Sequence, residues 1–178
     1  NVTAGALNVR TMKPNLSETE FFANVTAGNF DAYNLQAGVS GPISDNLGYR
    51  LSGADRKQDG FLESSTGAES RNRDRWMLRG QLLWEINDKA DVRFIVDYAE
   101  ADENCCDAVI VQESPGVALG SFAAAGLPAN GGAVNSGEDA FEARRSNAEQ
   151  FENPFEQGGI SVELNYDVSD SATFTYIG

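Results

Sequence analysis

Apolar and polar residues alternate with a period of two along most of this chain, which is the pattern of β-strands with two unlike faces. Alternation is clear at 33–41, 47–53, 75–86, 92–100 and 159–168, weaker at 20–30, and resumes at 172–177. The pattern therefore predicts an all-β chain with about seven strands, paired as antiparallel hairpins.

The apolar face of the predicted strands carries most of the aromatic residues. In the segment 75–86, Trp76, Leu78, Leu82, Trp84 and Ile86 share one face. The two tryptophans are separated by roughly 27 Å along such a strand. The opposite face is polar, and these residues are predicted to point into the interior of the fold: Arg50, Arg79, Gln81, Glu85, Arg93, Asp97, Glu163 and Asp167.

The connections between the strands alternate in length. Those at 41–46, 87–91 and 169–171 are short and rich in turn residues, whereas those at 62–74 and about 101–157 are long. Short turns at one end of a sheet and long loops at the other are typical of outer-membrane β-barrels. A soluble β-sandwich also alternates apolar and polar residues, but strands of about 9–12 residues with aromatic ends favour a transmembrane barrel.

The composition of the chain argues against several classes of function. The chain has 13 basic and 27 acidic residues, a net charge of −14, which argues against nucleic acid as a partner. It has no histidine, so a Ser-His-Asp triad or an imidazole-containing zinc site cannot form within it. No apolar run reaches the roughly 18 residues of a spanning helix. We therefore expect neither an enzyme nor a bound cofactor.

Three segments resemble a known family. The sequence GALNVRTMKP (5–14) is similar to the last strand of the plug domain in TonB-dependent outer-membrane receptors. The segments 28–61 and 73–106 resemble the first barrel hairpins of these receptors in order and spacing. The resemblance implies that residues 1–14 are the end of a plug. Residues 15–178 would then be the first part of a barrel of about 22 strands, with short periplasmic turns and long extracellular loops.

The resemblance also implies a function, namely active import of a scarce solute across the bacterial outer membrane. Cargoes of the family include ferric siderophores, other metal chelates, vitamins and oligosaccharides. The implied partners are the inner-membrane TonB energy-transducing complex, a small-molecule cargo, and outer-membrane lipid with lipopolysaccharide. Two alternatives are a passive porin-like channel or surface adhesin, and a secreted soluble β-sandwich that binds ligands.

Charged residues near the long loops are candidate contacts for cargo. The cluster Arg71, Arg73 and Arg75 would suit an anionic chelate or a lipopolysaccharide phosphate, although a solvated rim is the alternative. Asp102 and Glu103 belong to an acidic string that lacks the spacing of a calcium loop. A short helix within 137–152 would fold the long loop over the barrel mouth.

Cys105 and Cys106 are the two cysteines of the chain and are adjacent. Two neighbouring thiols cannot complete a four-ligand zinc or iron–sulfur site here. Their Cα atoms would lie about 3.8 Å apart across a trans peptide, so a ring between them is strained. Because the implied route crosses an oxidising periplasm, we predict a vicinal disulfide at the base of the long loop. Pairing with a cysteine elsewhere, or two free thiols, are the alternatives.

Overall fold

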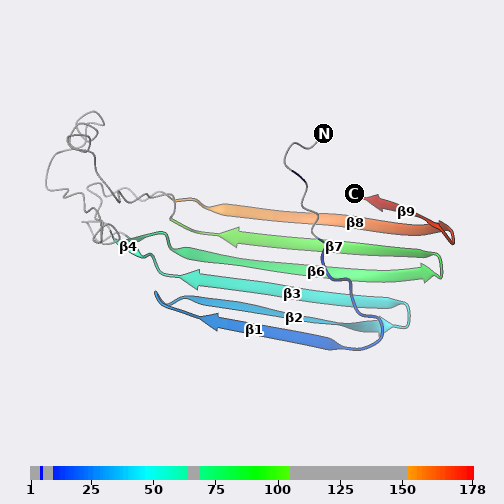
Figure 1. Cartoon of the computed structure of the whole chain (residues 1–178), viewed down its shortest axis with the longest axis horizontal. Coiled ribbons are helices and arrows are strands. Elements are labelled where there is room, and N and C mark those ends of the chain that lie inside the picture. Colours follow the sequence, from blue (N-terminus) through cyan, green and yellow to red (C-terminus); the bar gives the residue numbers. More distant parts are fainter. Residues whose placement is uncertain (1–4, 6–9, 64–68, 105–151) are drawn as a thin grey trace.

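One antiparallel sheet dominates the computed structural model, which describes residue 5 and residues 10–63, 69–104 and 152–178. Its seven strands lie side by side in chain order, each paired with the next strand of the sheet (Figure 1). They are β1 (Glu20–Ala27), β2 (Tyr33–Ser44), β3 (Leu47–Gln58), β6 (Arg73–Asn87), β7 (Ala90–Ala101), β8 (Phe155–Ser169) and β9 (Ala172–Ile177). The sheet is open, with β1 and β9 at its edges. The predicted fold class, an antiparallel barrel segment of about seven strands, is confirmed.

The three short turns share one local design. Each consists of two residues, Asp45–Asn46, Asp88–Lys89 or Asp170–Ser171, and follows a serine or asparagine. Before each turn one β-branched residue is bulged out of the pairing register, and these residues are Ile43, Ile86 and Val168. The bulge adds twist where the chain reverses.

The turn predicted at 41–46 is too long, because β2 continues through Pro42, which pairs with Gly48. Proline is tolerated in this strand because it lies next to a bulge.

The other end of the sheet has more elaborate connections. Between β1 and β2, Phe30 and Asp31 adopt the left-handed conformation, with φ of 62° and 48°. The ring of Phe30 lies 6.1 Å from that of Phe61. The loop between β3 and β6 contains a small hairpin, β4 (Leu62–Glu63) and β5 (Glu69–Ser70), which the sequence pattern did not predict. The predicted helix within 137–152 falls almost entirely outside the described residues.

Burial on the two faces of the sheet is the reverse of that in a soluble protein, because the apolar face is exposed and the polar face is covered. Large side chains of the apolar face are exposed, for example Phe21, Ile160 and Leu78, at 85%, 78% and 57%. Leu83 and Pro14 are the buried apolar side chains in the described part of the molecule, whereas the charged residues Arg50 and Arg93 of the polar face are buried as well. An apolar surface of this extent needs a non-aqueous neighbour. Among the described residues, no helix is long and apolar enough to cross a membrane.

The register places the aromatic residues as the pattern predicted. Trp84 and Tyr166 lie near the short turns, whereas Tyr33, Trp76 and Tyr98 lie near the long connections. The rings of Trp76 and Tyr98 pack with centroids 5.3 Å apart. Two bands of amphipathic rings thus flank the apolar face, as they do in proteins that sit at two water–lipid boundaries.

Candidate functional site: the polar face and the segment that crosses it

Three ion pairs organise the polar face. Arg93 Nη2 lies 2.5 Å from Glu163 Oε2, and both side chains are largely buried. Arg79 pairs with Asp97 at 3.1 Å, and Arg50 pairs with Glu20 at 3.0 Å. The alternation of the strands brings these groups to one face, and each pair links two different strands. The wall is thereby cross-linked and its charge largely neutralised.

Residues 10–16 cross this polar face and cover it. Arg93 Nη1 donates to the carbonyl oxygen of Thr11 at 3.4 Å, and Gln81 Nε2 donates to that of Met12 at 3.2 Å. The backbone N–H of Asn15 donates to Ser40 Oγ at 2.8 Å. In Figure 1 this stretch runs from the N-terminal side across the strands to the start of β1. These contacts explain why Arg93 and Gln81 are buried. All three hydrogen bonds use backbone atoms of the segment.

Charge and sulfur contacts complete the docking of this segment. Lys13 Nζ lies 3.6 Å from Asp91 Oδ2, and Arg50 Nη2 lies 3.6 Å from the sulfur of Met12. Arg50 therefore joins the segment to β1 through its pair with Glu20. Alternation alone could not show these partners, because nothing in a local pattern states which distant segment covers a face.

Gly48 of the wall makes room for the segment. A Cβ atom added to Gly48 would lie 2.7 Å from Leu16 Cδ2 and 3.1 Å from the carbonyl oxygen of Asn15. The backbone of the segment can approach the sheet closely here because this wall position carries no side chain.

Gly48→Ala is expected to weaken docking of the segment by about 1–3 kcal/mol, because the new methyl group overlaps Leu16. Hydrogen exchange of the Asn15 amide in the full-length protein measures this, since that amide depends on the bond to Ser40. Gly80→Ala is the matched control, because its Cβ would meet only Leu51 Cδ2, at 3.5 Å. Equal exchange in the two variants would contradict close docking.

At the long-loop end, Arg75 and Glu103 form a bidentate pair. Arg75 Nε and Nη2 donate to the two carboxylate oxygens of Glu103 at 2.6 and 2.5 Å. Glu103 is 8% exposed, and its own carbonyl oxygen accepts from the N–H of Asn153 at 2.7 Å. The hydrogen bonds from Arg75 lower the pKa of Glu103 below its usual value. This pair fastens both ends of the long connection to β6.

The lowered pKa makes the base of the long connection sensitive to acid. A depressed carboxyl pKa stabilises the folded state above the unfolded pKa, and this contribution is lost as the pH falls through the folded pKa. At pH values below about 4.5, the ordinary pKa of a Glu side chain, the Asn153 and Asp102 amides are therefore expected to lose protection against hydrogen exchange. Glu103→Gln is expected to remove this step. An unchanged acid step in that variant would refute the assignment.

The remaining candidate residues lie apart from these clusters. Arg71 has a left-handed φ of 63°, and its guanidinium lies 5.9 Å from the centre of the Phe61 ring. Arg73 borders a polar hollow of about 180 Å³ shared with Asp59, Glu69 and Asp74. Asp102 is exposed. The arginine cluster is thus divided among different contacts.

Two predicted interior residues lie near the short turns. Glu85 and Asp167 border a polar hollow of about 330 Å³, and Asp167 accepts a hydrogen bond from Thr173. The predicted disulfide at Cys105 and Cys106 lies outside the described residues. Sequence reasoning missed Ser40, Gly48 and Glu20, because their roles depend on contacts made by residues 10–16 and by Arg50.

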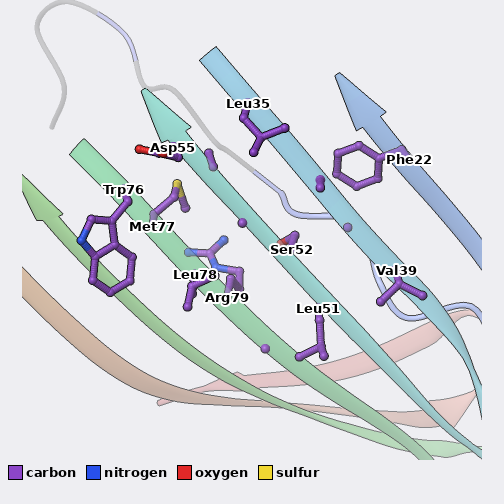
Figure 2. Close-up of a pocket in the computed structure, with 15 residues that line it drawn as sticks. Phe22, Leu35, Val39, Leu51, Ser52, Asp55, Trp76, Met77, Leu78 and Arg79 are labelled. Atoms are coloured by element: carbon purple, nitrogen blue, oxygen red, sulfur yellow. The ribbon is translucent and has the colours of Figure 1, made fainter. Parts of the chain in front are cut away.

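A wide apolar hollow lies on the sheet beside Trp76, Leu78 and Leu51, with a volume of about 850 Å³ (Figure 2). It forms where Ala37, Gly53 and Gly80 leave space between larger side chains. Its charged groups already have partners, since Asp55 accepts from Tyr33 and Arg79 binds Asp97. We assign it no part in the functional site.

No family model matches this chain, and no curated protein matches it. Among solved structures it is similar to the FpvAI–pyocin S2 complex, with a TM-score of 0.59 over 93% of this chain. The similarity supports the fold described above, a wall of antiparallel strands. The sequence identity is 17%, so the similarity establishes fold and not function. This chain spans 20% of the length of the matched chain.

Proposed function

We propose that this chain is part of a TonB-dependent receptor that imports a scarce small solute through the bacterial outer membrane. The observation that carries the proposal is the docking of residues 11–16 across the polar face of the sheet, through Arg93, Gln81 and Ser40. In a barrel this face lines the lumen. The segment would then be the end of a plug that enters the barrel before its first strand.

The bare apolar face supports an outer-membrane location. It carries exposed Leu, Ile, Val and Phe side chains between two bands of aromatic rings, which suits contact with lipid. A soluble sandwich instead turns its apolar face inward and its charged face toward water. Here the charged face is the covered one, because Arg50 and Arg93 are each 7% exposed.

A docked segment in the lumen favours gated transport over a passive pore. A passive channel works best with an open lumen, whereas a docked plug must be moved by an external source of energy. The pairs on the wall bind the segment partly through its backbone, which would hold it in place between transport events. Transport of this kind needs no covalent chemistry, so we propose no enzymatic step.

The test is uptake by the source bacterium with the full-length protein. A strain lacking this protein is compared with a strain lacking TonB, using labelled ferric siderophores, cobalamin and oligosaccharides as the panel. We expect both strains to lose uptake of the same solute. Uptake that needs this protein but not TonB would indicate a passive channel. Recovery of the native protein without detergent would refute both membrane functions.

A further inference from the structure

The polar face consists of rows of residues that are paired in register across the strands. One row contains Arg79 and Asp97, the next contains Arg50 and Glu20, and a third contains Arg93 and Glu163. In each of these rows an arginine is therefore accompanied by a carboxylate. The last row that crosses all the strands from β1 to β8 before the long connections differs, since it consists of Thr26, Asn34, Arg56, Arg75, Ala101 and Phe155.

This last row brings two positive charges together without an acidic residue between them. Arg56 and Arg75 are direct cross-strand partners on β3 and β6. The regular register of β3 puts Arg56 on the same face as Arg50, which contacts the docked segment. Like charges directly opposite one another destabilise a sheet. Such a pair is expected where an anion is to be bound.

Glu103 neutralises the charge of only one of the two arginines, Arg75. It engages Nε and Nη2 of Arg75, so the Nη1 edge of that guanidinium remains available. The bidentate contact also fixes the plane of the Arg75 side chain. Arg56 is exposed and has no hydrogen-bond or ion-pair partner among the residues that the structure describes. Glu103 is thus a positioning residue, and Arg56 supplies a second, free fork of donors.

We propose that Arg56 and Arg75 bind an oxyanion group, a carboxylate or a phosphate, on the imported solute. This inference rests on the proposed function, because it places the pair at the entrance of the lumen. Guanidinium forks match the planar geometry of such groups and donate two hydrogen bonds to them. A bound oxyanion would offset the repulsion between the two arginines. In a chain of net charge −14, the row is a local exception that an anionic solute can recognise.

The experiment uses the full-length protein purified in detergent, with citrate and inorganic phosphate as probes in separate titrations at low salt. We expect saturable binding of one probe, which weakens as salt is added. Arg56→Gln is expected to reduce that affinity about tenfold, by removing charge-assisted hydrogen bonds. Binding of citrate alone indicates a carboxylate solute, and binding of phosphate alone indicates a phosphorylated one.

Lys57→Gln is the matched control. Lys57 is the next residue of β3, lies on the opposite face and pairs with Asp74 at 3.7 Å, so its loss removes the same charge from the same strand. The affinity of the Lys57→Gln variant for the probe is expected to equal that of the wild-type protein.

Equal weakening in the two variants, or no saturable binding of either probe, would overturn the inference. TonB is absent from the titration, so a failure here leaves the uptake test of the proposed function unaffected.

Discussion

Leu51→Arg is expected to lower the free energy of unfolding of the full-length protein in lipid vesicles by about 2–4 kcal/mol. Leu51 is 55% exposed and pairs with Gly80, midway between Trp76 and Trp84 on the apolar face. A guanidinium at that level must either enter hydrocarbon or distort the lipid around it. Denaturant titration followed by tryptophan fluorescence measures the loss.

Gln36→Arg is the control, because it adds the same positive charge to the polar face. Gln36 lies on the polar face of β2, opposite Ala54, and its side chain is exposed, so an added arginine there stays in a polar environment. We expect a change within about 0.5 kcal/mol, as for a typical surface substitution. Leu51→Ala separates the effect of charge from that of lost side-chain volume. Similar losses for Leu51→Arg and Gln36→Arg would mean that the apolar face does not contact lipid.

Arg93→Met is expected to cost about 3–5 kcal/mol, the second large effect. The Arg93 and Glu163 side chains are 8% and 17% exposed, so removing the arginine leaves a carboxylate without its partner under the docked segment. It also removes the donor to the Thr11 carbonyl oxygen and to Gln81. The same denaturant titration measures the loss, and exchange of the Asn15 amide reports whether the segment has detached.

The double variant Arg93→Met, Glu163→Gln distinguishes charge from packing. If the unpaired carboxylate causes most of the loss, the double variant recovers much of the stability. Lys57→Met is the exposed comparison, because its pair with Asp74 is about half exposed on both sides and should be worth less than about 1 kcal/mol. A double variant no more stable than Arg93→Met would assign the effect to packing.

The period-two pattern predicted most of the sheet. It assigned the faces of β2, β3, β6, β7 and β8 correctly, because successive side chains of any strand point to opposite sides. It also located the short turns, although it placed Pro42 in a turn and not in β2. That error arose from the usual meaning of Gly-Pro as a chain reversal, which the neighbouring bulge at Ile43 overrides.

The candidate contacts near the loops were predicted less well. Arg71, Arg73 and Arg75 are close in sequence and form one cluster in the pattern, but in the structure the left-handed Arg71 lies over the Phe61 ring and Arg73 borders a polar hollow. Arg75 binds Glu103, a pairing across 28 positions that no short pattern contains. Arg56 was overlooked, although it continues the alternation that begins at Arg50.

Which residues share a face and which ends of the strands carry short turns can be predicted from the sequence alone, since both follow from the local geometry of a strand. What covers the polar face can be known from the folded molecule alone. The contacts of residues 11–16 with Arg93, Gln81 and Ser40 join positions 25 to 82 apart, and they depend on the register of five strands. Local periodicity contains no information about pairing at that distance.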